Sequence, residues 1–297
     1  MKRTKQTPLA ILTGDWHLRE TTPRCRTDDF MLAQTNKLVF IQALQQTHGC
    51  PVIHSGDLFN QWKPLPSPWL LSYALEFLPE QFWTIYGNHD LPEHSLKLSE
   101  RSGIRTLEQA GRLTVLPGVH WGQESWTNVV VPHPNNSTLE STIQVIHIMT
   151  YAGTPPWPGC MDPEAGELLR ATGPDLILTG HNHQAFVVEK NGRLLVNPGS
   201  LTRQKADQAD FRPRVYLWYP DNTVEAVYLP IEEGVVSREH LAKAEEQKSR
   251  AEAFIARLKQ DEAVSLSFRE NLERHFAMNE TSPSVEELIW SVYPGGD

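Results

Sequence analysis

Short apolar segments alternate with longer amphipathic segments along the first part of the chain. Residues 28–49 and 67–80 are amphipathic, with apolar positions that recur at a rough helical period, and Gly49 supplies a stop signal for the first helix. The apolar runs between them are brief and end in turn residues, which is typical of buried strands. They are PLAILTG (8–14), PVIHSG (51–56) and FWTIYG (82–87). Strands buried on both faces that alternate with helices predict layered α/β packing.

After Leu113 the pattern becomes rich in strands. Asn191-Gly192 predicts a hairpin with a type I′ turn, and PDNT (220–223) predicts a second hairpin. Two sheets packed face to face and flanked by helices would accommodate this number of strands. The expected strands are LTVLPGVHW (113–121), TNVVVP (127–132), TIQVIHIM (142–149), DLILTG (175–180), AFVVEK (185–190), RLLVNPG (193–199), RVYLWYP (214–220) and TVEAVYLPI (223–231).

From Ser237 the composition shifts toward Ala, Glu, Lys and Arg. We therefore expect a core domain over residues 1–234 and a helical appendage over residues 235–297, with further helices at 265–278 and 282–293. One face of the first helix is apolar and could dock a protein partner, form a homodimer or pack back on the core, the last being the commonest use of such a face. Its apolar residues are Leu241, Ala244, Ala251, Ile255 and Leu258.

Bulk composition narrows the class of protein. The net charge of -9 argues against a wholly basic nucleic-acid coat and leaves room for a local basic groove. The three cysteines are far apart without a CxxC pair, so neither a disulfide framework nor a thiolate zinc cluster is expected. No apolar run approaches the ~20 residues of a membrane span, and the N-terminal apolar run is too short for a secretion signal. We expect a cytoplasmic protein that acts without a membrane partner.

Polar residues cluster where five of the expected strands end. Residues just beyond the carboxyl ends of neighbouring strands converge on one crevice in α/β sheets. The alternative is that Gly, Asn and Asp simply form turns. His120 and His133 also follow apolar runs, but His147 ends the clearest strand of that region and is preferred. The residues in question are Asp15, His17, Asp57, Asn88, His89, Asp90, His147, His181 and His183.

Seven of these residues form a set of oxygen and imidazole donors without a thiolate. Such donors suit Mn²⁺, Fe or Zn²⁺, whereas Mg²⁺ is a poorer match for imidazole. Seven ligands are too many for one catalytic ion. Two ions ~3.5–4 Å apart that share one carboxylate would use all of them and leave open positions for water and substrate. The set is Asp15, His17, Asp57, Asn88, His147, His181 and His183.

The chain resembles the calcineurin-like metallophosphoesterase superfamily over about residues 8–230, on the ordered motifs GDWH, GDLFN, GNHD, a lone His147, and GHNH. The resemblance implies an α-β-β-α sandwich and a phosphoester hydrolase that uses two divalent ions, Mn²⁺ being favoured over Fe or Zn, with a hydroxide between the ions as nucleophile. Matched to the motifs, Asp15, His17, Asp57 and His183 would bind the first ion. Asp57, Asn88, His147 and His181 would bind the second, with Asp57 shared.

The resemblance also implies roles for two catalytic residues. His89 would steady the phosphate or protonate the leaving oxygen, and Asp90 would orient His89.

Two further segments, GDLFNQWKPLPS (56–67) and VNPGSLTR (196–203), are similar to SbcD-type nuclease subunits of double-strand-break repair. This similarity implies nucleic acid as substrate. Arg19, Lys63 and Arg203 are the expected substrate contacts, although a solvated loop explains Lys63 equally well. Residues 190–214 carry a local excess of four positive charges that could contact a phosphate backbone or form an ordinary exposed face.

Tryptophans near these loops are candidates for stacking on bases. Trp62 and Trp157 lie in Pro-rich loops and are preferred over Trp16, whereas Trp69 is expected in a helix core.

The chain departs from the SbcD-type pattern after its core, because residues 235–297 follow directly in place of a capping domain. A smaller nuclease, or another phosphodiesterase, is therefore expected. The alternative is an enzyme that hydrolyses small phosphodiesters or phosphomonoesters such as a cyclic nucleotide, a nucleotide or a phosphoprotein. A non-catalytic scaffold on the same fold ranks low, because all seven ligand positions and His89 carry chemically competent residues.

Overall fold

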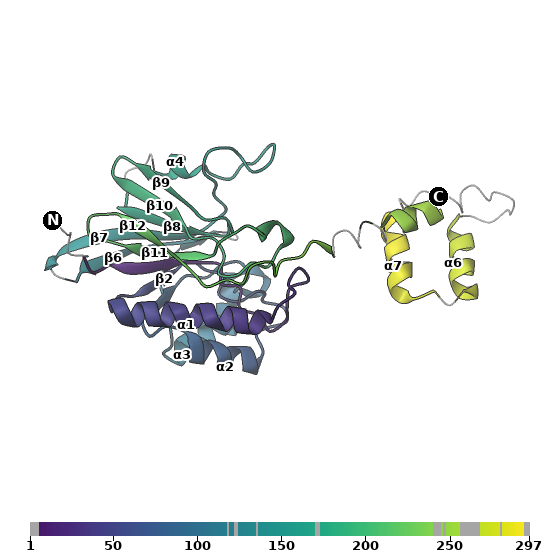
Figure 1. The fold of residues 1–297 in the computed structure, drawn as a ribbon, viewed down its shortest axis with the longest axis horizontal. Helices are drawn as coiled ribbons and strands as arrows, with labels where there is room; N and C mark the ends of the chain where they lie inside the picture. The colour runs from purple at the N-terminus through teal and green to yellow at the C-terminus, as the bar shows by residue number, and fades with distance from the viewer. Residues whose placement is uncertain are drawn as a thin grey trace. The chain divides into compact units, whose positions relative to one another are not determined.

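Two six-stranded sheets form the centre of residues 1–236, and helices cover their outer faces (Figure 1). The computed structural model describes residues 6–117, 119–121, 124–134, 136–169, 173–239, 245, 248–255, 268–279 and 281–293. The chain divides into two compact units between Val236 and Ser237.

The first sheet has the strand order β12-β11-β1-β2-β3-β4. Strands β1 to β4 run parallel to one another, as expected for the alternating pattern at the start of the chain. β11 pairs antiparallel with β1, and β12 pairs antiparallel with β11. The strands are β1 Ala10–Thr13, β2 Val52–His54, β3 Phe82–Thr84, β4 Thr114–Val115, β11 Arg214–Trp218 and β12 Val224–Tyr228.

The second sheet has the order β5-β6-β7-β8-β10-β9. Its strand β8 is parallel to both neighbours, β7 and β10, while the other pairs are antiparallel. β6 and β7 extend beyond the apolar segments expected from the sequence, because cross-strand pairing continues to His133 and Asn136 through polar residues. The strands are β5 Val119–Trp121, β6 Glu124–His133, β7 Asn136–His147, β8 Leu176–Gly180, β9 Phe186–Lys190 and β10 Arg193–Asn197.

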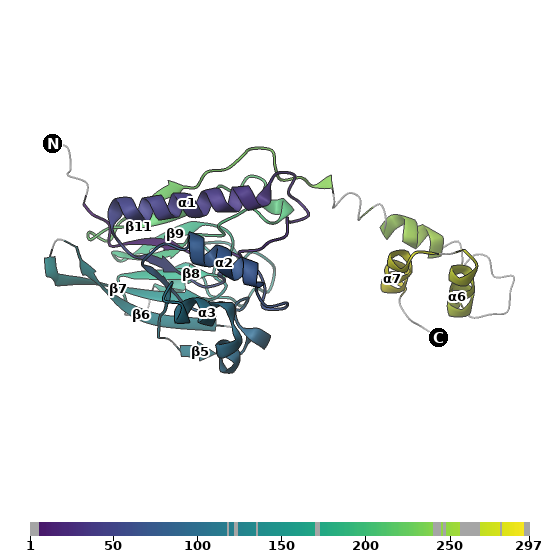
Figure 2. The same cartoon turned by 90° about the horizontal axis from the view of Figure 1, so that it is seen from below.

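Helices α1 (Phe30–His48), α2 (Pro68–Phe77) and α3 (Gly103–Gln109) lie on the outer side of the first sheet (Figures 1 and 2), and α4 (Ala165–Leu168) packs against the second. Short 3₁₀ turns are η1 Pro92–His94, η2 Leu96–Arg101 and η3 Ala206–Gln208. The predicted α-β-β-α sandwich is therefore confirmed.

Alternation along the strands explains how the layers adhere. Ile11 packs with the helices, whereas its neighbours Ala10 and Leu12 pack into the apolar layer between the two sheets. In the next strand Val52 faces the helices and Ile53 faces the other sheet. Because both faces of these strands are buried, polar residues occur mainly at the ends of the strands. The polar motifs therefore lie at the edge of the sandwich.

Local sequence signals behave as expected. The Asp29 side chain accepts from Leu32 N–H at the start of α1, and Gly49 ends the helix in a left-handed conformation with φ 63°. Asn191 and Gly192 have φ values of 54° and 72° between β9 and β10, as a type I′ hairpin requires. Both predictions are confirmed.

The smaller unit, residues 237–297, contains α6 (Phe268–Met278), α7 (Pro283–Val292) and helical residues 248–255. Ala251 and Ile255 from the predicted apolar face pack in a small core of this unit, while Leu241, Ala244 and Leu258 lie outside the described residues. Its buried members are Ala251, Ile255, Leu272, Phe276 and Ile289. Among the described helices of the whole chain, none combines the length and apolarity needed to cross a bilayer.

Candidate metal centre

The predicted ligand residues lie at the carboxyl ends of β1, β2, β3, β7 and β8 or on the loops directly after them, so both sheets contribute to one edge of the sandwich. Four of them adopt left-handed backbone conformations, with φ of 49° at Asp15, 45° at His17, 59° at Asp57 and 75° at His181. Positive φ is uncommon for residues other than glycine and is concentrated at functional sites. The loops therefore turn sharply directly after their strands.

Glycines allow these turns to pack side by side. A Cβ on Gly87 would lie 2.1 Å from Oδ1 of Asp57, and one on Gly56 would lie 2.8 Å from Nδ1 of His147. Gly56 also has a φ of 96°. No larger residue fits at Gly87 without displacing the carboxylate, which explains why glycine immediately precedes the polar motifs.

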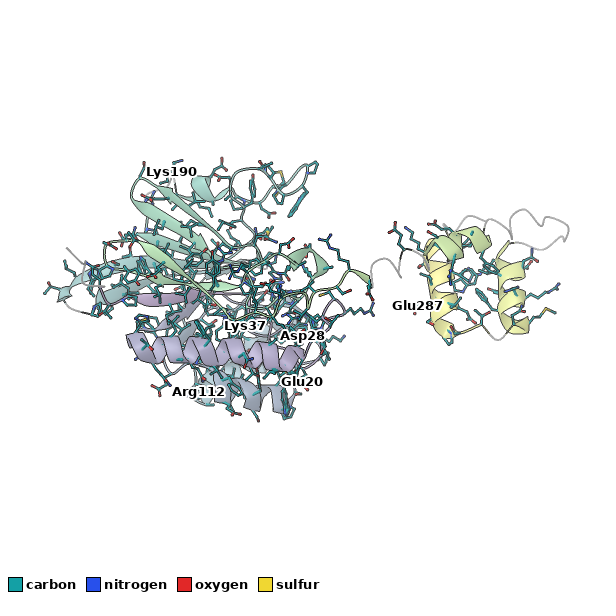
Figure 3. The ribbon with its side chains drawn as sticks, in the orientation of Figure 1. Glu20, Asp28, Lys37, Arg112, Lys190 and Glu287 are labelled. Atoms are coloured by element: carbon teal, nitrogen blue, oxygen red, sulfur yellow. The ribbon has the colours of Figure 1, made fainter. Side chains whose placement is uncertain are left out.

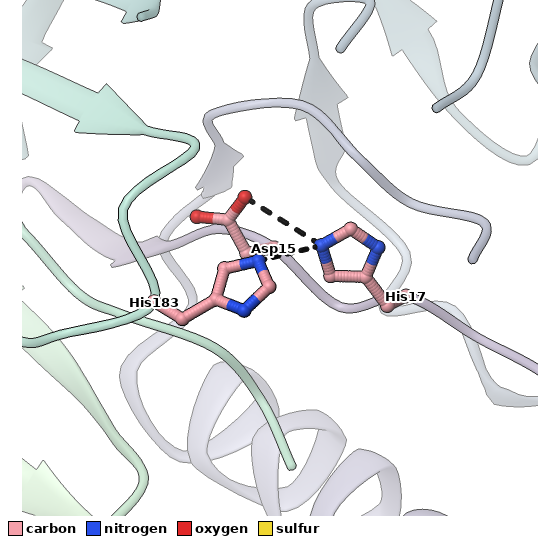
Figure 4. Close-up of side chains that lie close together, drawn as sticks. All are labelled: Asp15, His17 and His183. Carbon is pink, nitrogen blue, oxygen red and sulfur yellow. Dashed lines mark hydrogen bonds and ion pairs between the residues drawn. The ribbon is translucent and has the colours of Figure 1, made fainter. Parts of the chain in front are cut away.

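One group of donors consists of Asp15, His17 and His183 (Figure 4). The Nε2 atoms of the two imidazoles are 3.0 Å apart, and Nε2 of His17 is 3.9 Å from Oδ1 of Asp15. Asp15 is fully buried, and its carboxylate accepts the backbone N–H of His181 at 3.0 and 3.1 Å. Lone-pair atoms from β1 and β8 loops thus converge on one point.

A second group consists of Asn88, His147 and His181. Oδ1 of Asn88 lies 3.0 Å from Nε2 of His147 and 2.9 Å from Nδ1 of His181, and the two nitrogens are 3.3 Å apart. Nδ1 of His147 donates to the carbonyl of Ser55 at 2.8 Å, which leaves Nε2 as a lone-pair donor toward the cluster. His133, the alternative considered for His147, contacts Ser141 instead, and the side chain of His120 lies outside the described residues.

Asp57 lies between the two groups. Its Oδ2 atom is 3.6 Å from Nε2 of His17 and 3.3 Å from Nε2 of His147. Its Oδ1 atom accepts the backbone N–H of His89 at 2.8 Å. The side chain that the sequence predicts as shared therefore contacts both donor groups.

The protonation of the imidazoles suits a cation. Burial lowers the pKa of His17 well below its usual value and the pKa values of His181 and His183 to about 4, with the Lys205 charge adding to the effect on His183. These rings are neutral near pH 7, the form that binds a metal. Burial alone would lower the pKa of His147 too, but the Asp57 carboxylate raises it to about 9, so this fourth ring must lose a proton before it can bind a cation.

The carboxylates show the complementary effect. Burial raises the pKa of Asp15 to about 8, and the charge of Asp57 contributes. Burial also opposes ionisation of Asp57, but His147 and His17 lower its pKa below the usual range. A buried carboxylate beside a second one, with three of the four ligand imidazoles neutral, gains from a positive ion. The residues present thus fit a pair of divalent cations.

His89 and Asp90 differ from their expected relationship. Nδ1 of His89 donates to the carbonyl of Asn60 at 2.5 Å, and its ring packs edge-on against His17 with centroids 4.8 Å apart. Asp90 instead accepts backbone N–H groups of Asp57, Leu58, Phe59 and Gly87 at 2.9–3.3 Å. Asn60 therefore orients His89, and Asp90 fastens the β2 and β3 loops together.

A cleft of about 650 Å³ opens beside the donor groups. Trp157, one of the two tryptophans preferred for base stacking, lines it, as does Lys205, which the sequence did not single out from the surrounding basic residues. The remaining lining residues are Asp57, His89, Met149, Pro156, Asp162, His181, Asn182, His183, Gln184, Asp207 and Gln208.

The three predicted substrate contacts lie elsewhere. Arg19 lines a neighbouring pocket of about 310 Å³ and contacts Thr21 and Asn60. Lys63 is exposed on the loop before α2, outside the residues that line the main cleft. Arg203 is only 3% exposed and donates to the carbonyls of Ala209 and Glu232, so its charge is used inside the fold. Its expected contact with substrate is corrected.

The basic stretch over residues 190–214 also disperses. Arg212 and Arg214 lie over the ring of Tyr228 at 4.8 and 4.7 Å, and Lys190 donates to the carbonyl of Gly166. Of its six basic residues, Lys205 alone lines the cleft in the described structure. The basic residues that are close in the sequence therefore do not form one basic surface at the cleft.

Two tryptophans depart from expectation. Trp69, expected in a helix core, is 52% exposed and stacks on Tyr73 with centroids 5.3 Å apart. Trp16, a candidate for stacking on bases, is fully buried and donates to Thr13. Trp62 packs against His94, 6.1 Å between ring centroids.

Replacing Arg203 with methionine is expected to lower stability while leaving substrate binding unchanged. The variant removes the charged donors that bond to the partly buried carbonyls of Ala209 and Glu232, which costs about 2 kcal/mol in the free energy of unfolding. Burial, together with the charges of Arg26 and Arg203, lowers the pKa of Lys37, labelled in Figure 3, to about 8. Removing the Arg203 charge should therefore raise the pKa of Lys37. Denaturant unfolding measures the first effect, and KM for a phosphoester substrate checks the second. A raised KM with unchanged stability would contradict this structural role.

Comparison with known proteins gives both distant structures and a family. Among solved structures, an archaeal phosphodiesterase shares 12% identity with a TM-score of 0.41, covering 74% of this chain and 99% of its own. Vps29 of Entamoeba histolytica with Zn²⁺ shares 14% identity (TM-score 0.37; 74% and 97% covered), and a vacuolar protein sorting 29 protein of Cryptosporidium parvum shares 16% (TM-score 0.36; 75% and 97%). No curated protein matches the chain. The family model for the calcineurin-like phosphoesterase superfamily domain matches residues 11–213, a range that includes all five motif-bearing loops.

Proposed function

The chain belongs to the calcineurin-like phosphoesterase superfamily, and from this premise we propose that it is a dimetal-dependent phosphodiesterase that cleaves nucleic acid. One observation carries the proposal: lone-pair atoms of seven side chains, from strand ends and loops of both sheets, face one another across a buried carboxylate. Such convergence is unfavourable without positive charge between the donors.

The two cation positions follow from the donor groups. Asp15, His17 and His183 would hold one cation, and Asn88, His147 and His181 the other, with Asp57 shared. When bound, the cations would supply positive charge that acidifies water and offsets charge on the phosphoryl oxygens. Mn²⁺ suits this mixture of carboxylate, amide and imidazole best, and Fe or Zn²⁺ are the alternatives.

His89 is the residue proposed to act on the substrate itself. Because its Nδ1–H is bonded to Asn60, Nε2 remains available at the cleft wall to donate to a phosphoryl oxygen or to protonate the leaving oxygen. His17 packs against the ring and limits its rotation. Asp90 contributes indirectly, by holding the backbone that carries both Asp57 and His89.

Nucleic acid is proposed as substrate, with a role in DNA repair, because the segments at 56–67 and 196–203 are similar to SbcD-type nuclease subunits. A small-molecule phosphodiesterase is the second candidate. The volume of the cleft, about 650 Å³, favours it, since this is within the range of pockets for single small ligands. The helices of residues 237–297 are proposed to bind a protein partner or a second copy of the chain.

Cleavage of labelled oligonucleotides tests the proposal. The purified protein is depleted of metal with a chelator and then assayed on single- and double-stranded DNA and RNA with Mn²⁺, Fe²⁺ or Zn²⁺ added. We expect cleavage only after metal is restored, and mapping of end-labelled products would give polarity and mode. Absence of metal-dependent cleavage of every nucleic acid, with turnover of a cyclic nucleotide or a phosphomonoester, would replace the nuclease with the second candidate.

A further inference from the structure

A loop between β7 and α4 presents apolar side chains beside the donor groups. Its base is closed by a bridge between Tyr151 and Glu164 and by the bond from Ala165 N–H to the Tyr151 carbonyl. The segment between them, shown in teal beside α4 in Figure 1, contains four prolines and a local bond from Cys160 N–H to the Trp157 carbonyl. These features limit the conformations of an otherwise exposed loop.

Trp157 in this loop is 47% exposed and lines the cleft. Among the described residues its indole has no hydrogen-bond or ring partner, unlike Trp62, Trp69 and Trp218, which contact His94, Tyr73 and Asn222. The indole is therefore not engaged in a polar or ring contact within the described part of the chain. A large aromatic face left in a cleft wall is available to a ligand.

The cleft also carries charged side chains close to the donor groups. Lys205 is exposed, lines the cleft and acts electrostatically on His183, which belongs to the first donor group. Asp162 lines the cleft and acts on His181, in the second group. Lys205 is the one lysine or arginine among the described residues that line the cleft, which also holds the carboxylates of Asp162 and Asp207, so a second anionic group next to the reacting phosphate would be attracted to the Lys205 ammonium.

We propose that Trp157 and Lys205 determine specificity for single-stranded nucleic acid. A base adjacent to the scissile phosphodiester stacks on the indole, and the next phosphate along the strand lies against the Lys205 ammonium. This assignment rests on the proposed nuclease function and adds to it the recognition of a base, without reading which base it is. Stacking accepts every base because each has a π-face.

Base removal from the substrate tests the stacking contact. Wild-type protein with Mn²⁺ is compared on a short oligothymidylate and on the same oligomer built with abasic residues. Stacking is worth about 1–3 kcal/mol per base, which corresponds to roughly 5- to 150-fold in kcat/KM between the two oligomers. We expect this preference to disappear in Trp157→Ala and to persist in Trp157→Phe, with cleavage of the abasic oligomer unchanged in both variants.

The matched control is Met161→Ala, which removes a 94% exposed apolar side chain from the same loop but outside the cleft lining. It should retain the preference. Equal cleavage of both oligomers by the wild-type protein, or a preference that survives in Trp157→Ala, would overturn the assignment while the nuclease proposal stands. Cleavage of double-stranded DNA or RNA but of neither oligomer would overturn the assignment alone, whereas failure to cleave any nucleic acid would overturn the nuclease proposal and the assignment with it.

Salt dependence tests Lys205 separately. Loss of one phosphate contact to a single strand lowers the slope of log KM against log salt by about 0.7. Lys205→Gln should show this change, and Lys63→Gln, an exposed lysine outside the cleft lining, should not. An unchanged slope in Lys205→Gln would remove this residue from the proposal.

Discussion

Replacing Asp57 with asparagine is expected to lower kcat/KM by about 10³-fold or more, comparable to loss of a central catalytic group. Oδ2 of Asp57 contacts Nε2 of both His17 and His147, so this one carboxylate serves both donor groups. Asparagine keeps the shape and removes the negative charge that two cations would share. Whichever way its amide is oriented, asparagine presents either an N–H group toward the imidazoles or an N–H group toward the His89 backbone N–H.

Elemental analysis separates loss of metal from loss of chemistry. We expect about two divalent ions per chain in the wild-type protein loaded with Mn²⁺, and fewer than one in Asp57→Asn. Asp207→Asn is the matched control, because this exposed carboxylate lines the same cleft without belonging to a donor group. Full metal content together with full activity in Asp57→Asn would refute the shared-ligand assignment.

The convergence of the predicted ligand side chains could be predicted, because the arrangement of strands in the fold determines which strand ends meet. In a layered α/β fold the residues directly after parallel strands meet at one edge, whatever their separation in sequence. Asp15, His147 and His181 come from three different strands and still converge. The packing of each strand could also be predicted. Successive residues of a strand face opposite sides, so one set faces the helices and the other faces the second sheet.

Residues that recognise substrate were less predictable because charge in a sequence does not reveal exposure. Arg203 and Lys205 are two positions apart, yet one is buried against backbone carbonyls and the other lines the cleft. Trp69 looked like a core residue by helical periodicity but lies on the outer side of α2. Such outcomes depend on tertiary contacts of loops, which periodicity and composition do not encode.

The role of Asp90 illustrates the same limit. Its position after Asn88 and His89 suggested a direct contact with the imidazole, whereas its carboxylate reaches backbone N–H groups of a loop about thirty residues earlier in the sequence. A short polar side chain prefers nearby unpaired backbone donors, and the sharp turns after β2 and β3 expose several of them.

Replacing Asp90 with alanine is therefore expected to destabilise the protein as well as to reduce activity. The carboxylate is 3% exposed and accepts four backbone N–H groups from two loops. Each unsatisfied buried donor costs about 1–3 kcal/mol, so we expect a loss of roughly 4 kcal/mol or more in the free energy of unfolding. Because Asp57 and Gly87 are among the donors, the shared carboxylate should also shift and metal affinity should fall about 10- to 100-fold.

Denaturant unfolding in the presence of a chelator measures the first effect without a contribution from metal binding, and metal titration measures the second. Asp175→Ala is the matched control, since its carboxylate also joins two segments, through Thr142 N–H at 2.6 Å and the Thr142 hydroxyl at 2.9 Å, but at a solvent-exposed place. That variant should lower the free energy of unfolding by less than about 1 kcal/mol.

The stability of Asp90→Asn should fall between those of the wild-type protein and Asp90→Ala, because one oxygen still accepts while the amide N–H₂ faces backbone donors. Equal stabilities of Asp90→Ala and Asp175→Ala would mean that the two loops are held by other contacts and that the carboxylate does not organise the site.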